Sequence, residues 1–278
     1  MGFFEQAALA FYKVFHRKKL FSMQPSDLKM WQASRALGLA PQCGCLAPQY
    51  ENREFGNLKL HAEVQDTHAE GWKLLLELVD RAASKCSKEF APGLEMSPEL
   101  WSQVVTLPPS ISKLTSVRKF YLYGSHLVRL PPEIGDMAKL EELDLYTSYR
   151  LHWVPFEVTR CQKLKRSRVS TRAVYGNYKY RPPFPRLGVP ESKLNLPGSC
   201  SVCRRSLQPG EVHQAWLSLL VATDVLPLLV NACSDNCIQR LPAPVYGYVD
   251  QPHAGGLDVK QPPTGMVPPN PARNWTMD

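Results

Sequence analysis

The chain has 278 residues, of which 44% are hydrophobic and 21% charged, a composition typical of a soluble globular protein. Its formal net charge of +8 favours acidic partners, whether protein, nucleic acid or a membrane surface. No apolar run approaches the ~20 residues that a membrane-spanning helix needs, so we expect no membrane span and a cytoplasmic location.

Residues 1–100 carry helical patterns. Apolar side chains recur at helical spacing in residues 1–21, which favours an amphipathic helix over a targeting segment. Ser26 is an expected N-cap, residues 66–86 read as a longer amphipathic helix, and Ser97 precedes a short one. We expect these helices to cover one end of the repeats that follow.

Three consecutive segments between residues 104 and 173 share one apolar pattern. A Leu-Pro or Val-Pro pair begins at Leu107, Leu130 and Val154, at intervals of 23 and 24 residues, and further apolar positions keep the same register. This pattern resembles the leucine-rich repeat, L-x-x-L-x-L-x-x-N-x-L-x-x-L-P-x-x-I. The resemblance implies a short solenoid in which stacked repeats bury their apolar faces against one another.

The repeats depart from that pattern in an informative way. Ser125 and Ser148 replace the usual Asn, and their hydroxyls still bond backbone but build a weaker ladder. Ser167 stands where the third repeat should have a Leu. The array is therefore expected to be short and to need a cap at each end.

Alternate strand positions of the repeats are predicted to lie on one concave sheet face. This face combines three tyrosines with charges of both signs, and Tyr and Arg are common anchors of protein interfaces. It is either a protein-binding surface, the interpretation that we favour, or an ordinary solvated polar face. Its residues are Lys119, Tyr121, Tyr123, Glu142, Asp144, Tyr146, Arg166 and Arg168.

Residues 159–186 contain nine Lys or Arg, no acidic residue, and four interleaved aromatic rings, including Tyr175 and Phe184. This composition fits a groove for single-stranded nucleic acid, in which bases stack on the rings. It equally fits a contact with an acidic protein. A third possibility is a basic exit segment whose rings pack on the last repeat.

The chain has eight cysteines, and four of them form two close pairs. Cys200-x2-Cys203 and Cys233-x3-Cys237 are separated by a segment that reads as a β-hairpin, and four thiolates are what tetrahedral Zn²⁺ requires. The arrangement resembles a treble-clef zinc finger and predicts one structural zinc per chain with a closed ligand shell. Four buried free thiols, or paired disulfides, are the alternatives.

The other cysteines carry weaker signals. Cys86 ends a helical pattern and Cys161 lies in a repeat, and we expect both to be packing residues. Cys43 and Cys45 are too close together for a typical metal-binding knuckle.

A competing interpretation makes Cys233-Ser-Asp235 a nucleophile. Helices, repeats and a Cys-x-Asp motif occur in the same order in bacterial effector ubiquitin ligases. Only about a hundred residues follow the repeats here, and a thiolate held by zinc is a poor nucleophile, so we do not expect an enzyme.

The chain as a whole resembles bacterial leucine-rich repeat proteins with a small C-terminal zinc module. The expected fold class is α+β. The resemblance implies a scaffold that recognises another protein, with nucleic-acid binding as the alternative and a small-molecule substrate not expected. The expected tail is extended or disordered, with Tyr246, Tyr248 and Trp275 as possible tethers. The expected regions are helical 1–100, repeats 101–175, a basic connection 176–197, the zinc module 198–241 and the tail 242–278.

Overall fold

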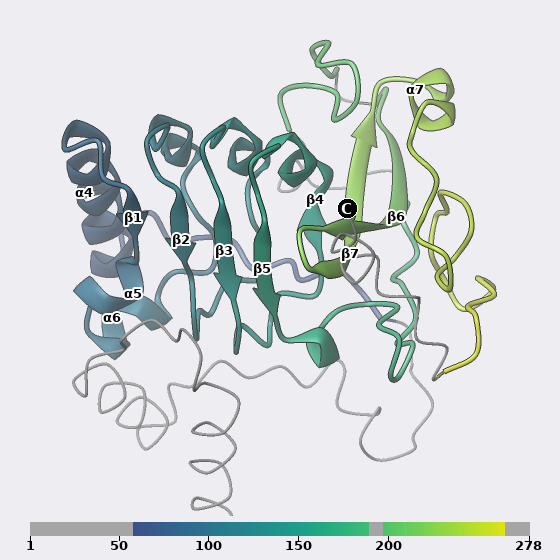
Figure 1. Ribbon diagram of the computed structural model, residues 1–278, viewed down its shortest axis with the longest axis horizontal. Helices are drawn as coiled ribbons and strands as arrows, with labels where there is room; N and C mark the ends of the chain where they lie inside the picture. The colour runs from purple at the N-terminus through teal and green to yellow at the C-terminus, as the bar shows by residue number, and fades with distance from the viewer. Residues whose placement is uncertain (1–57, 189–196, 209, 265–278) are drawn as a thin grey trace, which may run out of the picture.

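The computed structural model describes residues 58–188, 197–208 and 210–264 (Figure 1). The described part is a mixed α/β structure with a four-stranded sheet in the order β1-β2-β3-β5 and a three-stranded sheet in the order β4-β7-β6. The helix expected in residues 1–21, the N-cap at Ser26, and Cys43 and Cys45 lie outside the described residues.

The elements run in the following order, with η for a 3-10 helix: α4 Glu70–Ser84, β1 Glu89–Phe90, α5 Pro92–Glu95, α6 Pro98–Ser102, η1 Pro109–Lys113, β2 Lys119–Tyr121, η2 Pro132–Asp136, β3 Glu142–Leu145, β4 Val154–Pro155, η3 Phe156–Arg160, β5 Arg166–Val169, η4 Thr171–Ala173, β6 His213–Val221, β7 Asp224–Ala232 and α7 Asp235–Gln239.

The N-terminal end of the four-stranded sheet is covered by helices. The long helix α4 buries Leu75 and Val79 in the main core, and Ser97 caps α6 by accepting a hydrogen bond from the Leu100 backbone N–H. The expected packing role of Cys86 is wrong. Cys86 follows the end of α4 with a φ of 49°, and its side chain is exposed. The short strand β1 was not anticipated, and it extends the sheet by one strand.

The three repeated segments form equivalent units, each with a strand and a 3-10 helix. The strands are parallel and in register, so that Lys119 pairs with Glu142 and Glu142 with Arg166. A proline precedes each 3-10 helix with extended backbone, and its ring fixes φ where the chain turns. Figure 1 shows the strands side by side and the short helices following in the same order. The apolar repeat positions fill one continuous core.

Serine side chains link neighbouring units of the sheet. The hydroxyls of Ser125 and Ser148 lie 2.7 Å apart, and the Ser148 hydroxyl donates to the Leu122 carbonyl at 3.0 Å. The Thr147 backbone N–H donates to the Ser170 hydroxyl at 2.8 Å. Because these serines are buried, their hydroxyls satisfy backbone groups that water cannot reach.

The β6–β7 hairpin closes the other end of the core. β7 pairs in parallel with β4, and Val221, Leu226 and Leu228 belong to the same apolar cluster as the repeats. Ser167 of β5 meets the polar tip of this hairpin. Its hydroxyl donates to the Val221 carbonyl at 2.7 Å, and its carbonyl accepts from the Thr223 hydroxyl at 2.7 Å. A Leu side chain at position 167 could not make the hydroxyl bond.

Residues 174–187 and the described part of the tail pack around the hairpin. Tyr175 and Phe184 are buried against Trp216 in a second apolar cluster. The tail follows the outer edge of β6, where the backbones of Trp216 and His253 exchange hydrogen bonds of 2.8 and 3.2 Å. Of the two states expected for the tail, residues 242–264 are extended, and backbone hydrogen bonds hold them against the body.

The aromatic residues that were expected to tether the tail differ in burial. Tyr248 is buried, whereas Tyr246 is 71% exposed, and Trp275 lies outside the described residues. Within the part of the chain that the structure describes, no helix combines the length and apolar character that crossing a bilayer requires.

Candidate metal centre and strand face

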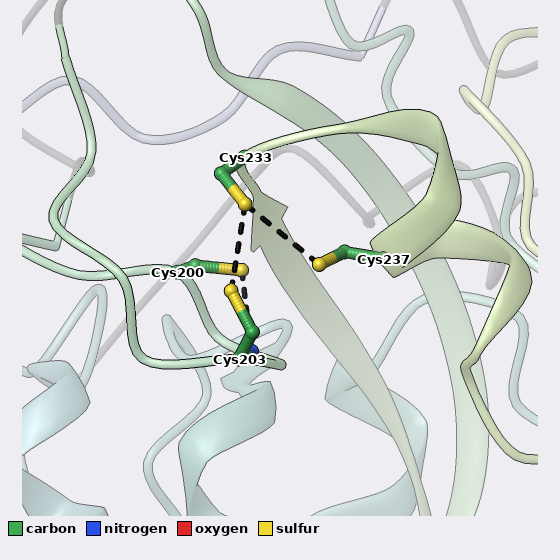
Figure 2. A group of neighbouring side chains, drawn as sticks. All are labelled: Cys200, Cys203, Cys233 and Cys237. Carbon is green, nitrogen blue, oxygen red and sulfur yellow. Dashed lines mark hydrogen bonds between the residues drawn. The ribbon is translucent and has the colours of Figure 1, made fainter.

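Four cysteine side chains converge at the base of the β6–β7 hairpin. Cys200 and Cys203 come from the turn that precedes β6, Cys233 directly follows β7, and Cys237 lies in α7. Their sulfur atoms all lie within 4.8 Å of one another. Figure 2 shows the four side chains pointing toward one another. The prediction that Cys200-x2-Cys203 and Cys233-x3-Cys237 come together is thus confirmed. This four-cysteine cluster can hold one metal ion.

The sulfur spacing fits a metal better than disulfides. The Sγ atoms of Cys203 and Cys233 are 3.5 Å apart, and those of Cys233 and Cys237 are 3.7 Å apart. A tetrahedral centre with metal–sulfur bonds of about 2.3 Å places its sulfurs about 3.8 Å apart. A disulfide needs about 2.05 Å. All described cysteines are free, so the disulfide alternative is not supported among them.

Backbone hydrogen bonds shape the first half of the four-cysteine cluster. The Cys200 N–H donates to the Arg205 carbonyl at 2.7 Å, and the Cys203 N–H points at the Cys200 sulfur at 3.5 Å. Arg204 takes a φ of 63°, which lets the chain reverse within this turn. Ser201 anchors the turn to β7, because its N–H donates to the Asn231 carbonyl and its hydroxyl accepts from the Asn231 N–H, at 2.8 and 2.9 Å.

The second half of the cluster depends on a helix start. The Ser234 hydroxyl accepts from the Cys237 backbone N–H and caps α7. The Asp235 carboxylate is 82% exposed and pairs with His213 at 2.7 Å. His213 therefore has an acidic partner of its own and does not replace a cysteine in the cluster.

The thiols of Cys203 and Cys233 differ in acidity. The Arg205 backbone N–H, followed by the Cys233 thiol, stabilises the thiolate of Cys203 and lowers its pKa to about 6. The hydrogen bond to Cys203 raises the pKa of Cys233 to about 12. A divalent cation would displace the remaining protons, as metal binding by thiols requires.

The predicted partner-binding residues share one face of the sheet, which we call the strand face. It comprises Lys119, Tyr121, Tyr123, Glu142, Asp144, Tyr146, Arg166 and Arg168. Across its first row, charges alternate along the in-register positions Glu89, Lys119, Glu142 and Arg166. Lys119 pairs with Glu89 at 2.5 Å and Arg166 with Glu142 at 2.9 Å. These charges largely neutralise one another.

Arg168 organises the opposite end of the strand face. Its guanidinium lies 4.6 Å from the ring centroid of Tyr146 and 5.9 Å from that of Tyr123, and the two rings are 6.1 Å apart. The same guanidinium pairs with the Asp144 carboxylate at 3.2 Å. Burial raises the pKa of Asp144, while Arg168 opposes that effect. Tyr146 remains 38% exposed, and together with Arg168 it leaves an aromatic and cationic surface open to solvent.

Comparison of the sequence with protein-family models and with curated proteins gives no match. The residues and their geometry therefore carry the functional argument.

The four aromatic rings of the basic segment 159–186 differ in burial, and Tyr178 and Tyr180 are half-buried beside Lys179 and Arg172. Tyr175 and Phe184 are buried, which agrees with rings that pack on the body of the protein. Five of its nine cations bind carboxylates or carbonyls within the protein: Arg160, Arg166, Arg168, Arg181 and Arg186.

Sequence reasoning missed Glu89, which extends the first row of the strand face by one strand. Glu89 belongs to a strand of two residues, which is too short to show an alternating pattern.

Proposed function

We propose that this protein recognises another protein with the strand face of a short leucine-rich repeat solenoid. Parallel strands that recur every 23 or 24 residues, each preceded by a proline-led 3-10 helix, support the solenoid. The observation that carries the function is the cluster of Tyr123, Tyr146 and Arg168. It presents two aromatic rings and a guanidinium that Asp144 holds in place.

The preordered cluster suits binding. An arginine held against aromatic rings has little conformational entropy left to lose when a partner covers it. Because the charges of the first row alternate in sign, they would favour one alignment of the partner on the strand face. They would not strongly attract a partner merely because of its net charge. The chain's net charge of +8 would speed its encounter with an acidic partner.

We further propose that the four-cysteine cluster binds one structural Zn²⁺. Four thiolates at tetrahedral spacing leave no position for water or substrate, so the ion would crosslink rather than catalyse. Zinc at this place would join the turn at Cys200 to the start of α7. It would thereby fix the base of the hairpin that closes the core.

Affinity capture from the native lysate tests the recognition proposal. The full chain, its Tyr123→Ala/Tyr146→Ala variant and a Tyr246→Ala control serve as baits, with nuclease added and at moderate salt. Tyr246 is a matched control because it is an exposed tyrosine of the tail rather than of the strand face.

A discrete protein retained by the full chain and the control, but lost by the double variant, is the expected outcome. Retention by all three baits would refute binding through the strand face. A third outcome is that all three baits capture material, and that this material is lost when nuclease is added or the salt concentration is raised. This outcome would instead favour nucleic-acid binding by residues 159–186.

A further inference from the structure

The four-cysteine cluster is connected to the strand face through the β6–β7 hairpin. The hairpin pairs nine residues of each strand without interruption, from His213 and Ala232 at its base to Val221 and Asp224 at its tip. Its base carries the cysteines and its tip holds Ser167 of β5. The paired strands thus form one continuous physical connection between the four-cysteine cluster and β5.

A second connection runs through Arg160 at the end of η3. Its guanidinium donates to the Ser201 carbonyl at 3.0 Å and reaches the Cys200 carbonyl at 3.5 Å. The chain then continues within a few residues into β5, which begins at Arg166. The turn that carries two of the cysteines is therefore bound directly to the unit that supplies the last strand of the sheet.

Both connections lead to β5. It is the terminal strand of the four-stranded sheet and pairs on one side with β3 only. Successive side chains of a strand point to opposite faces, so Ser167 faces the hairpin while Arg168 faces the tyrosines. Ser167 and Arg160 thus connect β5, the strand that carries Arg168, to the hairpin and to the turn that carries Cys200 and Cys203.

We propose that occupancy of the four-cysteine cluster regulates the strand face by fixing β5. With zinc bound, the turn at residues 200–205 is crosslinked to β7 and α7, and both connections to β5 are rigid. Without metal, the turn loosens, β5 frays, and Arg168 loses its fixed place between Asp144 and Tyr146. The consequence for partner binding depends on the function proposed above, whereas the coupling between the two sites does not.

Hydrogen exchange followed by mass spectrometry tests the coupling on the full chain without any partner. The zinc-loaded protein is compared with the same protein after treatment with a chelator. Peptides that cover β5 report the coupled strand. Peptides that cover β2 are the matched control, because β2 lies inside the same sheet and touches neither connection.

Removal of zinc is expected to speed the exchange of β5 amides about tenfold or more while β2 remains unchanged, as for a strand that opens locally. Unchanged exchange in β5, together with faster exchange at residues 200–206, would overturn the proposal. Equal acceleration of β2 and β5 would overturn it as well, since it would indicate global unfolding rather than transmission.

Two substitutions test the route. Arg160→Met and Ser167→Ala each weaken one connection and leave the four cysteines intact. Each variant should bind zinc at the wild-type stoichiometry, and the effect of zinc on β5 exchange should shrink in each and vanish in the double variant. Arg172→Met, which changes an exposed arginine of the next turn, should keep the full effect. A double variant with undiminished coupling would contradict the proposed route.

The regulatory consequence is tested separately, with the captured partner. Its affinity should fall on zinc removal by about the same factor as in the Arg168→Ala variant. A partner that binds equally with and without zinc would reject regulation. A protein that captures no partner but shows the exchange response would reject the recognition proposal and leave the coupling intact.

Discussion

At the scale of single residues, burial separates side chains that look alike in the sequence. Cys161 is buried, and burial raises the pKa of its thiol to about 12. Cys86 is exposed at the end of α4. Both were expected to be packing residues, and the expectation holds only for Cys161. Periodicity located both positions but could not show that α4 ends before its pattern does.

Thiol labelling should reproduce this difference. In the zinc-loaded protein at neutral pH, iodoacetamide should modify Cys86 rapidly and Cys161 hardly at all, because a buried thiol is neither accessible nor ionised. Peptide mapping by mass spectrometry identifies the labelled residues. Equal labelling of the two would contradict the described burial, and urea-unfolded protein provides the control in which both react.

His253 is a second residue whose environment sets a measurable property. Burial lowers its pKa to about 4, from an ordinary value of 6.5, and the ring packs on Phe184 with centroids 4.7 Å apart. Its Nδ1 accepts a hydrogen bond from the Gly255 backbone N–H at 3.1 Å, which favours the neutral ring.

This pKa predicts a dependence of stability on pH. Between pH 6.5 and 4 the unfolded chain binds the proton and the folded chain does not, so the contribution of His253 is complete above pH 6.5 and is lost as the pH falls toward 4. The loss is about 2 kcal/mol at a pH of about 4.5. Urea unfolding measures the free energy of unfolding at about pH 7.5 and at about pH 4.5. Between these two pH values it should decrease less for His253→Gln than for the wild type, by about the amount that His253 contributes. An identical decrease in both proteins would contradict the assignment.

At the scale of elements, the third repeat shows why a departure from a pattern can stabilise a fold. Ser167 occupies a Leu position, and its backbone and hydroxyl bind the tip of the β6–β7 hairpin. The buried position that Ser167 occupies in β5 is therefore polar. The in-register residues Phe120 and Leu143 are apolar, so the repeated pattern alone would predict an apolar side chain at position 167.

Ser167→Leu should accordingly destabilise the protein by about 2 kcal/mol, because it breaks the hydroxyl hydrogen bonds, leaves the Thr223 hydroxyl with fewer partners and introduces a larger side chain. Urea unfolding at neutral pH measures the change. Ser167→Ala, which removes only the hydroxyl, should cost about 1 kcal/mol. A Ser167→Leu protein as stable as the wild type would show that the hairpin does not depend on this contact.

At the scale of the whole molecule, some features followed from sequence and others did not. The repeat spacing predicted the parallel strands, because tandem apolar positions impose the same local structure each time. Cysteine spacing predicted the four-cysteine cluster and the hairpin between its halves. The parallel pairing of β4 with β7 and the path of the tail along β6 were missed, since contacts between residues far apart in the chain leave no periodic signal.

Metal content tests the proposed zinc centre as a property of the whole molecule. Protein purified without added metal should contain about one zinc per chain, and chelation should lower its melting temperature, because metal bound only to the folded state stabilises that state. Cys200→Ser should lose the metal, whereas Cys161→Ser should retain it. Full zinc content in Cys200→Ser would refute the site.

The most direct test of the central claim is the affinity of a captured, purified partner, measured by calorimetry. Three zinc-loaded proteins are compared: wild type, Tyr123→Ala/Tyr146→Ala and Tyr246→Ala. Loss of two central aromatic anchors should weaken binding by at least about thirtyfold, corresponding to about 2 kcal/mol, while Tyr246→Ala should bind as the wild type does. Equal affinities for all three proteins would contradict recognition through the strand face.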